Sequence, residues 1–357
     1  MSEYNIAVIR GDGIGPEVIE EGLKVLNFIS KNSNISFSFV EFDWGSDYYF
    51  KNGFMMPDDG LNQLLNFDSI YLGAVGHPEL QDHITLNGLL LPIRRKFDQY
   101  VCERPSTLYQ GVTSPLKGYK AGEIDFVVIR ENTEGEYANI GGFQYFGDSN
   151  EIGIQTGVFT KRGCERVINY AFQLARKRGN KKLVTSVTKS NAQGYGMVVW
   201  DRAFDNIARN YPDIKTESLL VDAACMDFIR KPEVFDVVVA SNLFGDILTD
   251  IGAIITGSMG LAPSGNIDPS RNFPSMFEPV HGSAPDIVDQ GVSNPLATIF
   301  SGAMMLDHLG ESSSSKIIQS AVEQLIKEGN ILTKDLGGTS STSKVGDSVV
   351  DYIKDLY

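Results

Sequence analysis

Two aspartates with helical spacing are the first residues that suggest chemistry. Asp246 and Asp250 lie four residues apart, shortly after the apolar segment Phe235–Ala240. On a helix they share one face, where two like charges repel unless a cation lies between them. Mg²⁺ and Mn²⁺ prefer such carboxylate oxygens. The spacing therefore predicts either a divalent-metal site or a solvated acidic helix face, and taken alone it favours the second.

A group of arginines suggests a site for an anion. Arg94, Arg95 and Arg104 lie in or beside predicted elements, and Arg130 directly follows the apolar run 125–129. A guanidinium binds a carboxylate through paired, planar hydrogen bonds. One such arginine is more often a surface ion pair, but several at the ends of elements indicate a ligand with more than one carboxylate.

Two later segments carry polar groups that a dehydrogenase could use. Lys189 follows a predicted strand and can relay a proton from a metal-bound hydroxyl, although most lysines in such places are only solvated. Phe277–Ile287 is a loop rich in Gly and Pro that holds His281 and two acids. A carboxylate in a cofactor loop can accept both ribose hydroxyls, which favours NAD over NADP. A metal-binding role for His281 is disfavoured because no second histidine is near.

The segment Gly11–Pro16 lies between a predicted strand and a predicted helix. Its glycines, Gly11, Gly13 and Gly15, do not have the spacing of the Rossmann dinucleotide fingerprint. A tight structural turn and a loop near a cofactor are equally good interpretations. A phosphate-binding hydrolase is disfavoured because no Gly-Lys-Ser/Thr follows the turn.

Composition excludes several classes of protein. The chain has 357 residues, 42% of them hydrophobic, and a formal net charge of −14, which disfavours nucleic-acid or anionic-membrane partners. Its 3 cysteines are widely spaced, which predicts reduced thiols in a cytoplasmic protein. No apolar run is long enough for a membrane span, and no signal peptide is evident. The serine tract 312–315 is predicted to be an exposed loop.

The hydrophobic pattern alternates between strands and helices along the chain. Short apolar runs such as 5–9, 69–75 and 235–240 are separated by segments with helical spacing such as 164–177. This alternation predicts an α/β protein whose largely parallel sheet is covered by helices.

The sequence resembles a known family over nearly its whole length. Six motifs occur in the family's order: Gly11–Val18, Arg130–Tyr137, Lys189–Asn191, Asn242–Asp250, Glu278–Asp286 and Asp335–Thr339. They are similar to motifs of the metal-dependent β-decarboxylating dehydrogenases, the isocitrate/isopropylmalate dehydrogenase family. The stretches 130–137, 236–250 and 271–279 most resemble its tartrate/D-malate branch.

The resemblance implies a role for each motif. Arg94, Arg104, Arg130 and Asn191 would bind the substrate; Tyr137 and Lys189 would be catalytic; Asp222, Asp246 and Asp250 would bind the metal; and His281, Gly282, Ser283, Ala284, Asp286 and Asn294 would bind NAD. In this family the tyrosine protonates the carbon that loses CO₂, and the lysine assists removal of the hydroxyl proton. Asp286 marks NAD preference, since relatives that use NADP carry a Lys-Tyr pair where this chain has Asp286 and Ile287.

The resemblance also implies a two-domain α/β fold that is not the Rossmann fold. Residues 1–98 and 257–357 would form the cofactor-binding domain, and residues 99–256 the domain with the metal and substrate site. An arm around 135–160 would clasp a second copy, because Lys189 and Asp222 are expected from the partner subunit of a homodimer. The sequence leaves open Mg²⁺ or Mn²⁺, a need for K⁺, and assembly beyond the dimer.

The expected reaction is NAD-dependent oxidative decarboxylation of a 2-hydroxy dicarboxylate, with (R)-malate or tartrate as substrate. Isocitrate enzymes place a Ser-x-Asn shortly before the first arginine, where this chain has Gly88–Ile93 with three leucines, which disfavours a third carboxylate. 3-Isopropylmalate remains an alternative, weakened because Asn87 replaces that branch's glutamate. A non-catalytic regulatory subunit is a remote alternative, because such subunits lose metal or arginine positions.

Overall fold

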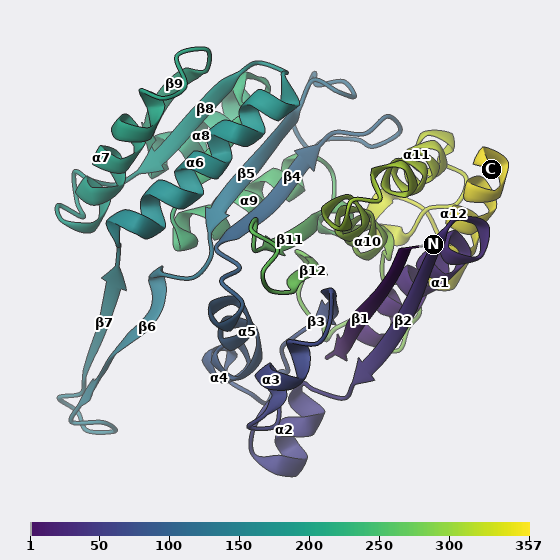
Figure 1. Ribbon diagram of the computed structural model, residues 1–357, viewed down its shortest axis with the longest axis horizontal. Helices are drawn as coiled ribbons and strands as arrows, with labels where there is room; N and C mark the ends of the chain where they lie inside the picture. The colour runs from purple at the N-terminus through teal and green to yellow at the C-terminus, as the bar shows by residue number, and fades with distance from the viewer. Residues whose placement is uncertain (1) are drawn as a thin grey trace. The chain divides into compact units, whose positions relative to one another are not determined.

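The protein is described by a computed structural model that covers residues 2–357. The chain folds into two compact units. Unit 1 contains the residues up to Gln99, Arg104–Ile124 and Gly252–Tyr357, and unit 2 contains Tyr100–Glu103 and Asp125–Ile251. Unit 1 therefore joins both ends of the chain, which are purple and yellow in Figure 1, while unit 2 is built from the middle of the chain.

Unit 1 is built on five strands and the helices that follow them. Its strands are β1 (Ser2–Gly11), β2 (Ile35–Phe42), β3 (Ser69–Ala74), β11 (Pro263–Ile267) and β12 (Ser275–Pro279). Its helices are α1 (Gly15–Asn32), α2 (Ser46–Asn52), α3 (Gly60–Leu64), α4 (Asp82–Thr85), α5 (Leu91–Lys96), α10 (Leu296–Leu309), α11 (Ser312–Glu328) and α12 (Thr342–Leu356). A π-helical turn, Leu86–Leu90, joins α4 to α5, and short 3₁₀ turns lie at Met259–Leu261 and Lys334–Leu336.

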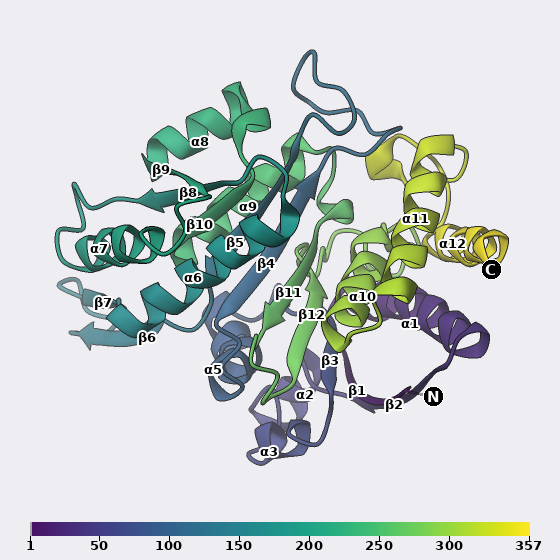
Figure 2. The ribbon, with the colours of Figure 1, turned by 45° about the horizontal axis from the view of Figure 1, so that its top comes forward.

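The sheet of unit 1 has the order β2-β1-β3-β12-β11. β1 pairs with β2 and β3, and β3 with β12, in parallel register, whereas β11 and β12 are antiparallel. All six residues of β3 are buried, as expected of a central parallel strand covered on both faces. On one face α1 packs on β2 and β3, and α10 packs on β11 and β12 (Figures 1 and 2).

The other face of this sheet is covered by a hydrophobic cluster from α2 to α5. Ile9, Ile70 and Leu72 of the sheet pack in it with Trp44 and Met55, and so do Leu89, Leu90, Ile93 and Phe97. The leucines that precede Arg94 are thus buried: Leu89 is 0% and Leu90 is 7% exposed. Their burial in this core explains why the segment is apolar.

Unit 2 contains a four-stranded parallel sheet and a separate two-stranded arm. Its elements are β5 (Asp125–Glu131), β6 (Gly135–Gln144), β7 (Ile152–Val158), α6 (Lys161–Arg178), β8 (Leu183–Thr188), α7 (Gly196–Ala208), β9 (Lys215–Leu220), α8 (Val221–Arg230), a 3₁₀ turn (Pro232–Val234) and β10 (Val237–Ala240). β4 (Val101–Thr107) and α9 (Asn242–Ile255) begin in one unit and end in the other.

The four strands have the order β5-β10-β8-β9, and all their pairs are parallel. α6 packs on β5, β10 and β8, and α8 on β8 and β9 (Figure 2). The rings of Phe126, Phe228 and Phe235 form one aromatic cluster. Because strands of one direction end at the same edge, Arg130 near the end of β5, Lys189 after β8 and Asn242 after β10 lie along one edge of this sheet.

The arm consists of β6 and β7, which pair antiparallel and run away from the four-stranded sheet (Figure 1). Near its tip Phe143, Tyr145 and Phe146 are 65%, 66% and 78% exposed. These three side chains form an exposed aromatic group at the end of the arm.

The two units differ from the predicted domains at Gln99, at residues 252–256 and, over the longest stretch, at residues 104–124. Residues 104–124 were placed in the central domain, but they group with unit 1. The reason is local packing, since Tyr109 stacks on Phe300 with ring centroids 5.4 Å apart, and Ser114 donates a hydrogen bond to the Ile255 carbonyl at 2.6 Å. That one domain binds the cofactor and the other the substrate stays a prediction.

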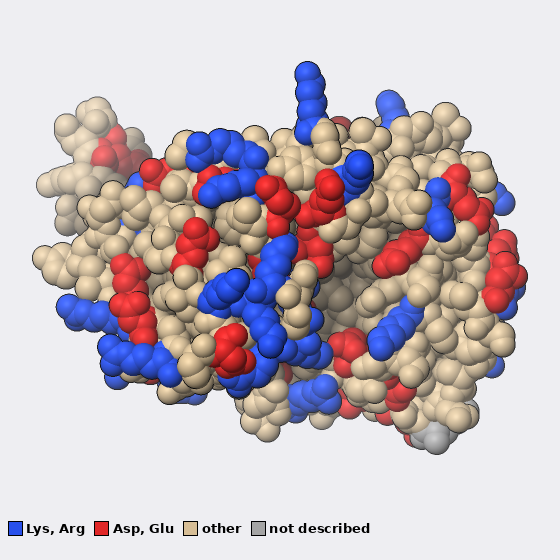
Figure 3. Space-filling model, turned by 90° about the horizontal axis from the view of Figure 1, so that it is seen from above, with Lys and Arg blue, Asp and Glu red and all other residues tan. Residues whose placement is uncertain are grey.

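Among residues 2–357, no helix combines the length and the apolar character that crossing a membrane requires. On the face drawn in Figure 3, acidic and basic side chains are intermixed. The excess of acid is therefore not gathered into a single region of that face.

Candidate active site

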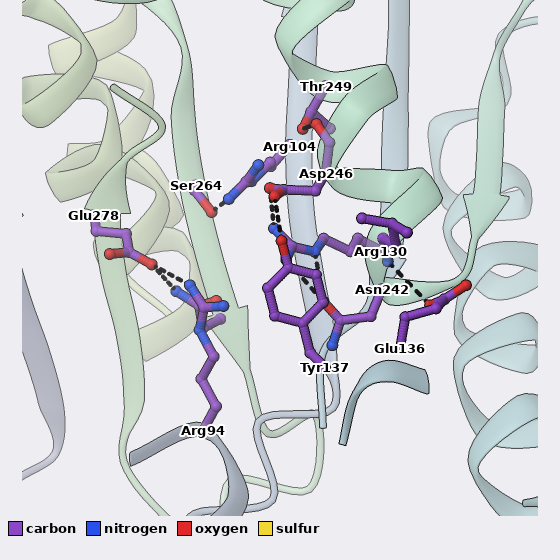
Figure 4. A network of polar contacts seen from close by, with 12 residues as sticks. Arg94, Arg104, Arg130, Glu136, Tyr137, Asn242, Asp246, Thr249, Ser264 and Glu278 are labelled. Atoms are coloured by element: carbon purple, nitrogen blue, oxygen red, sulfur yellow. Dashed lines mark hydrogen bonds and ion pairs between the residues drawn. The ribbon is translucent and has the colours of Figure 1, made fainter. Parts of the chain in front are cut away.

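Arg130 stands at the centre of a polar network in unit 2 (Figure 4). The residue lies in β5 and is only 2% exposed. Its Nε and Nη2 both donate to Asn242 Oδ1, at 3.1 and 2.7 Å, and its Nη1 donates to Asp246 Oδ1. A buried guanidinium requires such partners, because an unpaired charge is costly to bury. Asn242 and Asp246 therefore fix the direction in which Arg130 presents its charge.

Tyr137, in the first half of β6, meets the same carboxylate. Its hydroxyl donates to Asp246 Oδ2 at 3.0 Å, and the Arg130 guanidinium lies 5.3 Å from the centre of its ring. A phenol is a proton donor and acceptor, and a guanidinium over its ring adds a cation–π contact. The predicted proton donor, one predicted metal ligand and one predicted substrate ligand are thus in direct contact.

The start of α9 is tied to the segment between Arg130 and Tyr137. Glu136 accepts hydrogen bonds from Ser241 Oγ at 3.0 Å and from the Leu243 backbone N–H at 3.2 Å. Asn242 Nδ2 donates to the Glu134 carbonyl at 3.2 Å. These bonds fix the first turn of the helix that carries Asp246.

Gly245 lets Arg130 approach α9. A Cβ built on Gly245 would lie 2.6 Å from Cβ and Cγ of Arg130, closer than side-chain atoms come. A larger residue would therefore push the arginine away from Asp246.

Asp246 and Asp250 lie one turn apart on α9, as the spacing predicted. The side chain of Asp246 is 34% exposed and Asp250 is exposed, so both are open to an ion from solvent. Two carboxylates on one helix face fit the hard oxygen ligands that Mg²⁺ and Mn²⁺ take. Within residues 2–357, however, no three His, Cys, Asp or Glu side chains come together as a metal site. Asp222 does not join the pair in the single chain.

Asp222 instead pairs with Lys189. Lys189 Nζ lies 2.5 Å from Asp222 Oδ1, and this hydrogen bond lowers the pKa of the Asp222 carboxyl. The two side chains are 27% and 60% exposed, and Asn191 is exposed in the turn after β8. The two residues that the resemblance assigned to a partner's site are thus held together on the surface of the chain.

Arg94 and Arg104 belong to unit 1. Arg94 is 5% exposed and its Nη2 donates to Glu278 Oε1 at 2.9 Å, while its Nε is buried and has no partner (Figure 4). Glu278 also accepts from Asn266 Nδ2 at 2.7 Å. Arg104 is 7% exposed, and its Nε is 3.4 Å from Ser264 Oγ. Arg95, by contrast, is exposed and does not share this setting.

The predicted cofactor loop lines a cavity of unit 1. The cavity has a volume of about 680 Å³ and is formed by residues 75–82 and by Gly282, Ser283, Ala284 and Pro285. This size is within the range of small-molecule sites. His281 begins the loop, and burial lowers the pKa of its imidazole. Its Nδ1 lies 3.0 Å from the Gly282 carbonyl, and its Nε2 is buried and has no partner.

Asp286 and Asn294, the other two predicted cofactor residues, differ in exposure. Asp286 is exposed, so its carboxylate is open to a ligand. Asn294 is 6% exposed, donates to Asp335 Oδ2 at 2.9 Å and accepts from the Leu296 N–H at 3.0 Å. Its amide therefore connects the loop to the start of α10 and to the turn that holds Asp335.

Sequence reasoning missed the supporting residues. Asn242 and Glu278 contact the predicted substrate arginines, and Glu136 holds the start of α9, yet nothing in their spacing distinguishes them from ordinary polar residues. Asn242 and Glu136 lie within motifs that were recognised as a whole, and the pairing of Glu278 with Arg94 joins positions 184 residues apart. Only the folded chain shows such a pairing.

The sequence is similar to known proteins over nearly its whole length. The family model "Isocitrate/isopropylmalate dehydrogenase" matches residues 5–349. A probable tartrate dehydrogenase/decarboxylase of Agrobacterium vitis is 50% identical over 99% of this chain and 98% of its own length. The D-malate dehydrogenase [decarboxylating] of Escherichia coli is 49% identical over 99% of both chains.

A solved structure is similar over almost its full length. The crystal structure of isocitrate dehydrogenase from Methylococcus capsulatus matches with a TM-score of 0.89 and 33% sequence identity, over 98% of this chain and 99% of that one. The α/β fold class expected from the sequence, with a largely parallel sheet, is thereby confirmed.

Proposed function

The chain belongs to the isocitrate/isopropylmalate dehydrogenase family, and from this membership we propose that it oxidises and decarboxylates a 2-hydroxy dicarboxylate, with (R)-malate or tartrate as the substrate. It is an enzyme of the decarboxylating dehydrogenase type, as its relatives are named. The observation that supports the proposal is the contact of Arg130, Asp246 and Tyr137, because a guanidinium suits a carboxylate, a carboxylate suits a metal ion and a phenol can donate a proton.

The residues fit the two cofactors that the family implies. Asp246 and Asp250 offer one face of carboxylate oxygens to Mg²⁺ or Mn²⁺, and Asp222 of a second copy would complete the set. His281, Gly282, Ser283, Ala284, Asp286 and Asn294 are proposed to bind NAD, with the unpartnered His281 Nε2 and the open Asp286 carboxylate as its polar contacts. When bound, the metal would supply Lewis-acid polarisation of the substrate's 2-hydroxyl, and NAD the acceptor for the hydride from C2.

The chain's own residues would perform the remaining steps. Arg94, Arg104 and Arg130 would hold the two carboxylates, and Asn191 would add an amide contact. Lys189 would accept the proton of the 2-hydroxyl as the hydride leaves C2. After the β-carboxylate departs as CO₂, the Tyr137 hydroxyl would give its proton to the carbon that carried it. For (R)-malate the products would be pyruvate, CO₂ and NADH.

A homodimer with shared active sites would supply Lys189 and Asp222. The apolar side chains of Met226 and Ile229 on α8, and of Ile247 on α9, are 51%, 47% and 45% exposed in the single chain. Together with the aromatic tip of the arm they offer a surface for a second copy. The cytoplasmic location and a need for K⁺ stay predictions.

A substrate panel tests the proposal. Purified protein with Mn²⁺ and NAD⁺ would be given (R)-malate, meso- and (+)-tartrate, 3-isopropylmalate and isocitrate, and NADH formation would be followed at each concentration. We expect the highest kcat/KM with (R)-malate or a tartrate. A much higher kcat/KM with 3-isopropylmalate would replace this substrate assignment, and no turnover of any of them would contradict a catalytic role.

A further inference from the structure

The glycine turn between β1 and α1 carries a buried carboxylate that the proposed reaction does not use. Asp12 is 7% exposed. Its Oδ1 accepts the backbone N–H of Ser46 at 2.7 Å, and its Oδ2 accepts both Ser46 Oγ at 2.7 Å and the backbone N–H of Gly76 at 2.8 Å. The donors come from the first residue of α2 and from the loop after β3, so one carboxylate joins three segments of unit 1.

Glycines permit this close approach. Gly45, which precedes α2, has φ of +149°, and a Cβ there would lie 2.7 Å from Asp12 Oδ1. On the other side of the turn, Gly13 has φ of +59°, and a Cβ there would lie 2.7 Å from Ser283 Cβ. Both positions combine a positive φ with the absence of space for a side chain, which together require glycine.

The same turn contacts the predicted cofactor loop. The backbone N–H of Ile14 donates to the Ser283 carbonyl at 2.9 Å, and Gly76 lies close enough for a Cβ to be 3.4 Å from Ser283 Oγ. Gly76 and Ser283 are both in the wall of the 680 Å³ cavity. Asp12 thus holds one wall residue directly, and the turn it belongs to holds another.

We propose that Asp12 is a positioning residue for the dinucleotide cavity. It fixes Gly76, and through its turn Ser283, in the arrangement that binds the cofactor before the cofactor arrives, without touching the cofactor itself. The advantage is preorganisation, since a wall that is already ordered loses less entropy on binding. This inference rests on the proposed use of NAD.

The test is Asp12→Asn, which keeps the size and removes the charge. Whichever way the amide turns, its NH₂ group faces the backbone N–H of Gly76 or that of Ser46, and one of these donors loses its acceptor. Hydrogen bonds to a charged group are worth enough to change affinity by about tenfold or more when lost. We expect the NADH Kd, measured by fluorescence, and the KM for NAD⁺ to rise about tenfold, while the KM for the dicarboxylate changes less than about twofold.

Asp268→Asn is the matched control. Asp268 is also buried, at 1% exposed, and accepts four hydrogen bonds within the turn between β11 and β12, from Ser270 N and Oγ, Asn272 N and Phe273 N. It loses a comparable set of bonds but lines no part of the cavity, so its NADH Kd should stay that of the wild type. An equal rise in both variants, or no rise in Asp12→Asn, overturns the inference while NAD use stands. A wild-type protein that binds no NADH overturns the proposed NAD use and this inference with it.

Hydrogen exchange decides the question if Asp12→Asn does not fold. In the wild type without NADH, the Gly76 amide should already be protected, because the Asp12 carboxylate holds it. A Gly76 amide that exchanges as fast as an open loop until NADH is added contradicts preorganisation by Asp12.

Discussion

The network around Asp246 and the cavity beside Ser283 are built in opposite ways. In the first, polar and charged side chains from β5, β6 and α9 contact each other directly. In the second, loops with little side-chain chemistry are held by backbone hydrogen bonds and by the carboxylate of Asp12. The proposed catalytic site thus depends on side-chain contacts, and the proposed cofactor site depends on backbone geometry. Replacing a side chain should therefore affect substrate turnover most in the first region and dinucleotide affinity most in the second.

The largest effect is expected from Asp246→Asn. The amide removes one proposed metal carboxylate, and its single oxygen leaves either Arg130 or Tyr137 without its present acceptor. kcat/KM should fall by roughly a thousandfold or more, because the loss of a Lewis acid costs several kcal/mol of transition-state stabilisation. Steady-state rates at several Mn²⁺ concentrations measure it. Asp213→Asn, which breaks an exposed pair with Arg176, should retain wild-type rates. A near-normal rate in Asp246→Asn would remove the network from the active site.

Asn242→Ala should have the next largest effect. It should weaken binding of the dicarboxylate and leave binding of the dinucleotide unchanged, the opposite of Asp12→Asn. The change removes the acceptor of two Arg130 donors, so the KM for the dicarboxylate should rise about tenfold to a hundredfold, with the NADH Kd unchanged. Initial rates with each substrate varied in turn provide both values. Asn169→Ala, which removes the acceptor of the Tyr211 hydroxyl elsewhere in unit 2, serves as the control. A rise in the NADH Kd instead would show that the network around Asp246 also determines dinucleotide affinity.

Mixing two inactive variants tests whether the first region is completed by a second copy. Lys189→Ala and Tyr137→Phe should each be nearly inactive. In a mixed dimer one site would combine the intact Tyr137 of one subunit with the intact Lys189 of the other, so random reassortment should restore about a quarter of wild-type activity. The rate after joint refolding or co-expression measures this. Absence of any recovery, with mixed dimers demonstrated, would place both residues in the site of a single chain.

The smallest effect concerns stability rather than rate. Burial raises the pKa of the Glu131 carboxyl to about 6, although Thr133 and Glu134 donate hydrogen bonds to it. The folded state therefore favours the protonated form of Glu131. The stability that this carboxyl contributes is present at low pH and is lost as pH rises through about 6. The free energy of unfolding of Glu131→Gln, taken relative to that of the wild type, should therefore rise by about 2 kcal/mol from pH 4.5 to pH 7.5.

Thermal unfolding of both proteins at the two pH values measures this change. A difference in Tm that is independent of pH would show that Glu131 does not titrate in that range.

The sequence predicts those features that depend on local patterns, and it does not predict contacts between residues that are far apart in the chain. Asp246 and Asp250 could be predicted as a candidate metal pair because helical spacing needs only local information. Arg130 could be predicted as a candidate carboxylate ligand because it follows an uninterrupted apolar strand. The fold class followed from the alternation of the hydrophobic pattern and is confirmed, whereas the roles of the motifs rest on the family resemblance and stay predictions. The supporting contacts of Asn242 and Asp12 depend on long-range packing, which no local pattern reveals.

Local patterns also gave wrong interpretations where packing decides the structure. The serine tract 312–315 was predicted to be an exposed loop but forms the first turn of α11, with Ser314 and Ser315 buried. Ser315 Oγ donates to the Ala303 carbonyl at 2.7 Å, so the small polar side chains let α11 pack closely on α10. Composition alone cannot distinguish a serine that faces water from one that bonds to a neighbouring helix.

The proposed reaction joins the oxidation and the decarboxylation of a 2-hydroxy dicarboxylate in one enzyme. Its most direct test is the stoichiometry with (R)-malate, Mn²⁺ and NAD⁺, in which NADH is followed by absorbance and CO₂ and pyruvate are counted in the same sample. We expect equal amounts of NADH, CO₂ and pyruvate. Formation of NADH with oxaloacetate and without CO₂ would show that the enzyme does not decarboxylate its substrate.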